Sequence, residues 1–159
     1  MNTKNNQTNA AKNLGKLPVW NLKDLYLSQN DKSLTRDLHN IKNGTLKFEK
    51  KYLNKVKSLT ADDLFKAINK LEQIDVLMDK ILSYAHLLVA EDGNNEKNKI
   101  FYQQMQETIT NYASSIIFFT LELNQISEKK INKLVKNQKL QIYKNWIINK
   151  RSFKPYQLD

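Results

Sequence analysis

Apolar residues recur at helical spacing along most of the chain. Between about residues 32 and 57 they fall three, four or seven positions apart, which is typical of one face of a helix. The members of this stripe are Leu34, Leu38, Ile41, Phe48, Tyr52 and Val56. Gly44 and Thr45 lie where the stripe is thinnest and are candidates for a bend. The pattern predicts a first helix over residues 32–57.

The stretch Thr60-Ala61-Asp62-Asp63 has the chemistry of a helix start, because a hydroxyl cap precedes acids in the first turn. It opens a second stripe of Leu64, Ile68, Leu71, Met78, Leu82 and Ala85, which ends near Asp92-Gly93. A third stripe follows Asn94-Asn95 and consists of Phe101, Met105, Ile109, Tyr112, Ile116, Phe119 and Leu123. Each helix would hold about thirty residues, or roughly 45 Å. Their short polar turn predicts an antiparallel hairpin.

Two shorter helices are expected after the hairpin. Ser127-Glu128 should cap one with Ile131, Leu134 and Val135 facing inward, and the next should cover residues 138–150. Before the first helix, residues 17–26 lack a long period and are expected to lie as an extended or single-turn strap. Residues 1–16 have the composition of a disordered leader. The predicted fold is all-α: one domain over 17–159, a helical bundle built around the long hairpin.

Composition supports long helices over sheets. With three Gly and two Pro, the chain cannot supply a turn every 8–12 residues or so, as a β-sandwich or barrel requires. The absence of Cys excludes disulfides, thiolate nucleophiles and Cys-ligated zinc. No apolar run approaches the ~18 residues of a membrane span, and the first twenty residues lack an apolar signal core. We therefore expect a cytoplasmic location and no membrane partner.

The net charge of +10 raises the question of nucleic-acid binding. Lys outnumbers Arg 24 to 2, although specific phosphate and base recognition relies on Arg forks. Lys, Asn and Ile are also the residues that AT-rich codons favour. The charge is uneven: residues 1–57 carry +8, residues 58–124 carry −5 and residues 125–159 carry +7. Basic ends and an acidic middle should largely neutralise each other in a bundle, so nucleic acid is not an expected partner.

Candidate catalytic and metal-binding residues are few. The only histidines, His39 and His86, have no second His or Glu at a ligand spacing. We expect His39 at the surface and His86 in the interior near Tyr84. The acids Glu91, Asp92 and Glu96 do not match a calcium-binding loop and are typical of a solvated turn. No catalytic, cofactor-binding or metal-binding residue is therefore predicted.

Other chemistry is equally sparse. So few glycines leave no phosphate-binding loop or nucleophile elbow. The aromatic residues follow the helical stripes and are expected in the core, not on a base-stacking platform: Tyr84, Phe101, Tyr112, Phe118 and Phe119.

Four stretches in order resemble one protein family. They are Leu17-Pro-Val-Trp-Asn-Leu-Lys-Asp-Leu-Tyr26, Ser83-Tyr-Ala-His-Leu87, Phe118-Phe-Thr-Leu-Glu-Leu123, and Lys154-Pro-Tyr-Gln-Leu-Asp159 after Arg151. Together they resemble the N-terminal helical domain of oligoendopeptidase F, a zinc metallopeptidase of the thimet oligopeptidase-like group. Each motif is weak alone, and four in register are more specific.

The resemblance implies a helical domain that walls one side of a substrate channel and restricts access to short peptides. In that family a later domain carries HExxH, with two zinc-binding His and a general-base Glu. None of those positions is in this sequence, so the chain alone should be inactive and hold no cofactor, whereas the full-length family uses zinc. Asp159 stands like the N-cap of a further helix, which suggests an interrupted gene.

The sequence is compatible with two functional interpretations. The chain could be the noncatalytic part of a decayed or split peptidase, with a separately encoded catalytic half as its partner. Alternatively, it could be an independent helical module that binds another protein, because bundles serve many roles.

Overall fold

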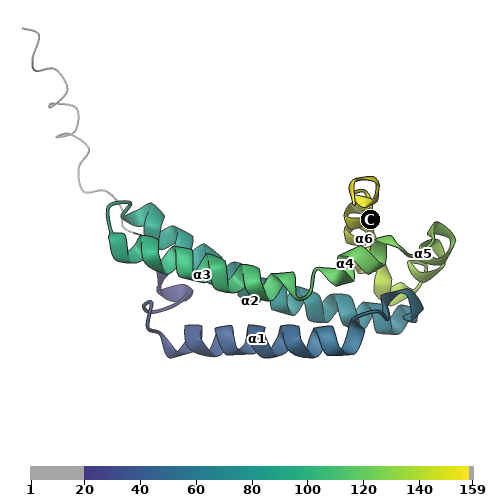
Figure 1. Cartoon of the computed structure of the whole chain (residues 1–159), viewed down its shortest axis with the longest axis horizontal. Helices are drawn as coiled ribbons and strands as arrows, with labels where there is room; N and C mark the ends of the chain where they lie inside the picture. Colours follow the sequence, from purple (N-terminus) through teal and green to yellow (C-terminus); the bar gives the residue numbers. More distant parts are fainter. Residues whose placement is uncertain (1–19, 158–159) are drawn as a thin grey trace, which may run out of the picture.

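The computed structural model describes residues 20–157, and it contains only helices and connecting turns within that range. The helices α2 (Ala61–Glu91) and α3 (Glu96–Ser114) run antiparallel, and α1 (Lys32–Tyr52) lies lengthwise beside them (Figure 1). The shorter helices gather at the end of this body where α1 stops. The all-α prediction is confirmed.

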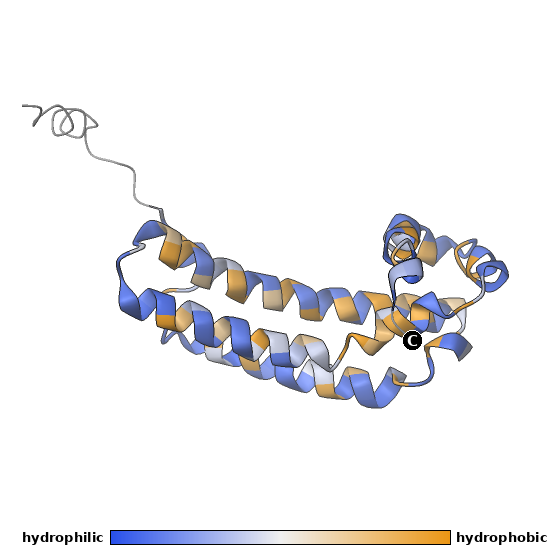
Figure 2. Ribbon diagram, turned by 45° about the horizontal axis from the view of Figure 1, so that its top comes forward, coloured by the Kyte–Doolittle hydropathy of each residue, from blue (hydrophilic) through white to orange (hydrophobic). Residues whose placement is uncertain are grey.

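The core follows the predicted stripes. Hydrophobic residues recur as bands along the long helices, between stretches of hydrophilic residues (Figure 2). Buried residues from all three long helices belong to one hydrophobic cluster. On α1, the residues Leu34, Ile41, Phe48 and Tyr52 are buried. The five aromatic residues expected in the core all belong to it, with Tyr84, Phe101 and Phe119 buried and Tyr112 and Phe118 packed against them at its edge.

The predicted bend at Gly44 is wrong, because α1 runs unbroken through it. The glycine instead lets α1 approach α2 closely. A Cβ placed on Gly44 would lie 3.2 Å from Cγ1 of Ile74. A larger side chain here would force the Ile74 side chain or the helices themselves to shift.

Polar caps fix the beginnings of the long helices. Thr60 accepts a hydrogen bond from the backbone N–H of Asp63, as the sequence predicted for the start of α2. Asp31 caps α1 through the N–H of Ser33, and Asn95 caps α3 through the N–H groups of Lys97 and Asn98. These caps satisfy backbone donors that have no partner inside the helix.

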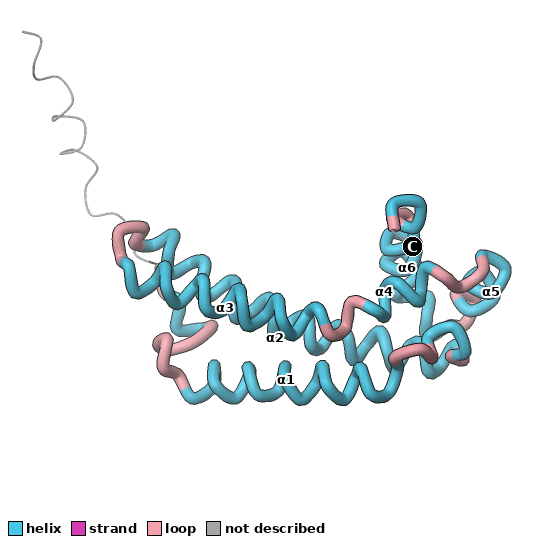
Figure 3. Tube along the Cα trace, in the orientation of Figure 1, coloured by secondary structure: helices cyan, strands magenta, loops and turns pink. Residues whose placement is uncertain are grey.

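Two predicted helices are too long. The first ends at Tyr52, because Asn54 takes a left-handed backbone with φ of 62° before a 3₁₀ turn, η3 (Val56–Ser58). The third ends at Ser114, and a turn over residues 115–117 separates it from α4 (Phe118–Asn124) (Figure 3). At this turn the hydroxyls of Ser114 and Ser115 bond the carbonyls of Thr110 and Tyr112, a local alternative to continuing the helix.

The final segment is also more broken than predicted. Helix α5 (Glu128–Leu134) has the expected Ser127 cap. The helix expected over residues 138–150 divides into a 3₁₀ segment, η4 (Gln138–Tyr143), and α6 (Lys144–Arg151), followed by a short turn, η5 (Lys154–Tyr156). In Figure 1, α6 stands away from the axis of the long helices, so an inner corner forms between them.

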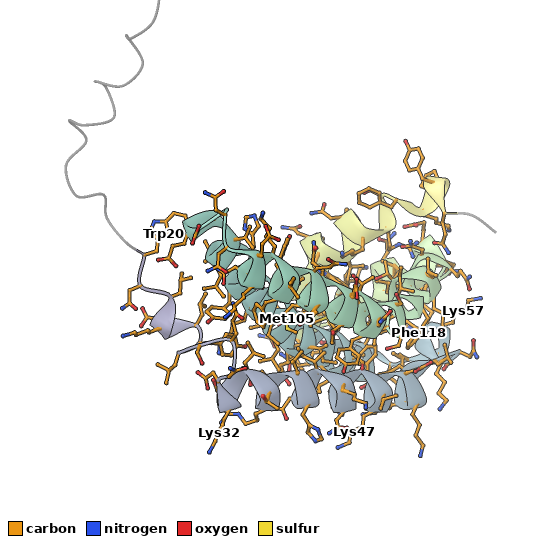
Figure 4. All side chains as sticks on the ribbon, turned by 60° about the vertical axis from the view of Figure 1, so that its left-hand side comes forward. Trp20, Lys32, Lys47, Lys57, Met105 and Phe118 are labelled. Atoms are coloured by element: carbon orange, nitrogen blue, oxygen red, sulfur yellow. The ribbon has the colours of Figure 1, made fainter. Side chains whose placement is uncertain are left out.

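The strap is partly confirmed. It contains a single 3₁₀ turn, η2 (Leu22–Asp24), and Tyr26 beyond it is buried. Trp20, in contrast, is 53% exposed and stands at the outer edge of the molecule (Figure 4). The leader over 1–16, the start of the strap at Leu17, and the tail residues Leu158 and Asp159 lie outside the described residues. Within residues 20–157, no helix has the length and apolar character needed to cross a membrane.

A buried polar network ties the strap to the long helices. The hydroxyl of Tyr26 donates to Asp37 on α1 at 3.0 Å, and Lys80 of α2 lies 3.4 Å from the same carboxylate oxygen. Lys80 also lies over the Tyr26 ring, 4.2 Å from its centre. Burial, followed by the bond to Asp37, raises the pKa of Tyr26 above its usual range.

Candidate functional site

The two histidines lie on different helices, His39 on α1 and His86 on α2. Both are exposed: His39 bonds Asn43 at 2.7 Å, and His86 packs beside the Tyr102 ring. The prediction of an interior His86 is wrong. The buried positions of α2 nearest to His86 are Ile81, Tyr84 and Ala85. Each further residue of a helix turns the side chain by about 100°, so His86 points out of that stripe.

The acids near the hairpin turn behave as a solvated turn. Glu91, Asp92 and Glu96 are all exposed. Asp92 accepts the backbone N–H of Asn94 at 3.1 Å, and Glu96 pairs with Lys99 at 2.8 Å. Across the part of the chain that the structure describes, no three metal-ligating side chains gather closely enough to hold an ion.

The inner corner holds a concave surface, which we call the corner groove. It consists of two adjoining hollows of about 390 and 370 Å³ that share Leu71, Asp75 and Trp146. Residues of α2, the end of α3, η4 and α6 line it. Three of its apolar side chains are well exposed: Val76 at 59%, Ile117 at 60% and Ile142 at 73%. The corner groove therefore presents apolar surface to solvent.

Acids lie along the α2 side of the corner groove. Glu72, Asp75 and Asp79 line its first hollow, and Glu72 accepts the hydroxyl of Tyr143 at 2.6 Å. The loss of water around Asp75 raises the pKa of its carboxyl, the neighbouring Asp79 raises it further, and Lys150 opposes both effects. Burial and the bond to Glu72 likewise raise the pKa of Tyr143. The corner groove can thus contact apolar groups and accept hydrogen bonds.

A separate hollow, which we call the lysine groove, opens between the start of α2 and α5. Its volume is about 710 Å³. Leu59, Ala61 and Leu134 supply apolar surface. Its remaining members are polar or charged: Thr60, Ser127, Lys129, Lys130, Lys133, Lys136 and Asn137. The lysine groove combines an apolar floor with a positive rim.

Two buried charges hold the short helices that shape both grooves. Glu122 of α4 accepts the backbone N–H groups of Asn54 at 2.6 Å and Val56 at 3.1 Å. Arg151, at the end of α6, donates to the carbonyl of Leu123 at 2.6 Å and pairs with Glu128. The first contact fixes the turn after α1, and the second joins α6 to α4 and α5.

Sequence reasoning did not find either groove. The exposed apolar residues at Val76 and Ile142 were the available signal, because both lie outside the predicted stripes. In the sequence, the lysines that line the lysine groove are only part of a general excess of basic residues. Which lysines share a hollow depends on how α5 packs against the start of α2, and a local pattern does not contain that information.

Comparison with known proteins identifies one segment. Residues 122–159 match the family model of the peptidase M3 N-terminal domain, which is described as Oligopeptidase F. No curated protein and no solved structure matches the chain. The match includes the last of the four resembling stretches and the end of the third, whereas 17–26 and 83–87 lie outside it. The end of the chain is therefore similar to part of the N-terminal domain of oligopeptidase F.

Proposed function

We propose that this chain, with its oligopeptidase F segment, serves as the noncatalytic substrate-access domain of an oligoendopeptidase F-like metallopeptidase. The catalytic part would come from a separate or further polypeptide that carries the HExxH helix. The observation that carries the proposal is the corner groove. The family-matching segment supplies its Ile142, Tyr143 and Trp146, so the matched residues help to build the concave apolar surface.

The corner groove has features suited to one wall of a peptide channel. Exposed Val76, Ile117 and Ile142 offer contacts to apolar side chains of an extended peptide. Carboxylates at Asp75 and Asp79 can accept hydrogen bonds from its N–H groups. A wall of this kind binds and orients the substrate, and the bond cleavage is left to other residues.

The described residues do not offer a binding site for the zinc ion that the family uses. Zinc sites need three or four ligands, and His39 and His86 lie exposed on different helices with no acid beside either at bonding distance. Zinc-dependent cleavage is therefore assigned to the catalytic partner and not to residues 20–157.

A second candidate function is an independent protein-interaction module. This function is favoured because the family match is short: α1, α2 and α3 lie wholly outside residues 122–159. The two candidates differ in what the chain must bind.

Reconstitution separates the two candidates. The purified chain would be mixed with a polypeptide that carries the family's HExxH region, and complex formation, melting temperature and cleavage of a short peptide would be measured. The proposed function requires a complex and a raised melting temperature, because binding to the folded state stabilises it. No complex between two folded partners would leave the module interpretation.

A matched pair of variants tests the corner groove itself. Ile142→Asp changes a residue of the groove, and Leu27→Asp changes a residue just after the strap that is equally exposed at 73%. In the reconstituted complex, Ile142→Asp should raise the KM for an apolar peptide roughly tenfold, since it places a charge against an apolar contact. Leu27→Asp should leave it unchanged. Equal effects would contradict the assignment of the wall to this groove.

A further inference from the structure

We propose that the lysine groove binds an acidic segment of a protein partner, one that carries apolar side chains between its carboxylates. This site is separate from the corner groove and does not depend on the proposed peptidase role. It would attach the domain to another protein whether or not a catalytic part is present.

The charges of the lysine groove have no carboxylate partners within ion-pair distance among the described residues. None of the four rim lysines appears in the ion pairs of residues 20–157, although Lys139 nearby pairs with Asp62 at 3.2 Å. Lys130 donates instead to the backbone carbonyl of Lys57. Like charges so close repel one another, and a carboxylate between them would relieve that repulsion.

The nearby acids are already paired with other cations. On the α5 side, Glu128 is the only acidic side chain from residue 125 to residue 157, and it pairs with Arg151. On the α2 side, Asp62 pairs with Lys139 and Asp63 pairs with Lys66. Lys129, Lys133 and Lys136 follow each other at four and three positions, which places them along one side of α5 and the turn after it. A row of carboxylates on an approaching segment matches this arrangement.

The floor of the lysine groove selects for apolar side chains as well. Leu59 and Ala61 are half-buried and Leu134 is 9% exposed, so the apolar surface is recessed below the lysines. A side chain such as Leu can enter the hollow while flanking acids remain at the rim. This combination of a recessed apolar contact and surrounding charge is typical of peptide recognition.

The same geometry argues against nucleic acid and membrane as the natural ligands. Nucleic-acid sites use aromatic residues for stacking and Arg for bidentate contacts, and the lining of this groove has neither. Membrane binding needs apolar side chains that protrude into lipid, whereas this floor is recessed. The acidic protein segment is the occupant that fits both the rim and the floor.

The test is fluorescence anisotropy with the full chain and a short labelled peptide in which pairs of glutamate alternate with leucine. The groove variant combines Lys129→Gln, Lys133→Gln and Lys136→Gln. The control combines Lys32→Gln, Lys42→Gln and Lys47→Gln on α1, which removes the same charge from exposed positions. Lys32 and Lys47 lie on the outer side of α1, away from the bundle (Figure 4).

We expect the groove variant to raise the Kd roughly tenfold and the control to change it less than about threefold, with both melting like the original chain. Replacing the leucines of the probe by serine should weaken binding to the original chain. An equal loss of affinity in both variants would show that the peptide responds only to the net charge of the chain, and it would overturn the proposal. Binding of an RNA oligonucleotide or of vesicles with anionic lipid at least as tight, and lost with the same three lysines, would also overturn it.

Discussion

The long helices and the short helices of this protein are held in place by different kinds of contact. In the body formed by α1, α2 and α3, apolar stripes pack along almost their whole length, and the helix ends are capped by nearby residues. At the end formed by α4, α5 and α6, the helices are seven or eight residues long, and the buried charges Glu122 and Arg151 reach across the chain to join them. The periodic apolar stripes therefore hold the long helices together, whereas individual polar contacts hold the short helices in position.

The largest effect should follow from removing the charge that fixes the end of α1. In Glu122→Ala, the backbone N–H groups of Asn54 and Val56 lose their acceptor, and Val56 is fully buried. Because two bonds to a charged group disappear, we expect a loss of about 3 kcal/mol in the free energy of unfolding, measured by urea titration.

Glu91→Ala is the matched control for this change. Glu91 is the exposed last residue of α2, so its removal should alter stability by less than about 0.5 kcal/mol. Similar losses in the two variants would show that Glu122 does not hold the two regions together.

The sequence could predict the body well because its information is local. Stripes at three and four positions located α2 from Thr60 to its end, and the caps at Thr60 and Asn95 follow from residue chemistry. The breaks at Asn54 and after Ser114 could not be predicted in the same way. The first depends on Glu122, which lies 68 positions away in the sequence from Asn54. Apolar residues also continue through both breaks, so the stripe itself gives no stop signal.

The same reasoning applies to candidate sites. The absence of a local zinc-binding pair was visible from two isolated histidines, whereas the corner groove needs α2, α3 and α6 to be placed together. His86 shows that local patterns can also mislead. An error of one residue in the predicted apolar stripe of α2 is enough to place an exposed side chain in the interior.

The next largest effect tests how closely the helices of the body pack. Gly44→Leu should destabilise the protein by about 2 kcal/mol, since even the first atom of the new side chain would lie 3.2 Å from Ile74. The comparison is Gly93→Ala, where the nearest atom to an added Cβ is 3.8 Å away. Thermal melts of both variants check the prediction. If Gly44→Leu were as stable as Gly93→Ala, α1 and α2 would not be in close contact at this point.

A smaller effect concerns the buried polar network of Tyr26, Asp37 and Lys80. Tyr26→Phe removes the hydroxyl that bonds Asp37, which should cost about 1–2 kcal/mol at pH 8. The pKa of Tyr26 is raised in the folded protein, so its contribution is complete below the unfolded value of about 10 and declines as the pH rises above it.

The cost of Tyr26→Phe should therefore shrink with pH. By pH 11 the difference between the original chain and the variant should have fallen by about 1 kcal/mol, because the unfolded tyrosine ionises while the folded one does not. Urea titrations of both proteins at pH 8 and pH 11 give this difference directly. A constant difference would mean that the hydroxyl is not shielded in the folded state.

The smallest expected effect lies only six residues from Tyr26, at Trp20. Tyr26 is 2% exposed and completes the core, whereas Trp20 is 53% exposed at the edge of the molecule. Trp20→Ala should therefore change the free energy of unfolding of the isolated chain by less than about 0.5 kcal/mol. If the chain binds a catalytic partner through this edge, the same substitution should weaken that complex, because an exposed Trp is a frequent anchor of protein interfaces. The two measurements are independent: a stability loss as large as that of Tyr26→Phe would assign Trp20 to the core of the domain, and an unaltered affinity for the partner would remove this edge from the interface.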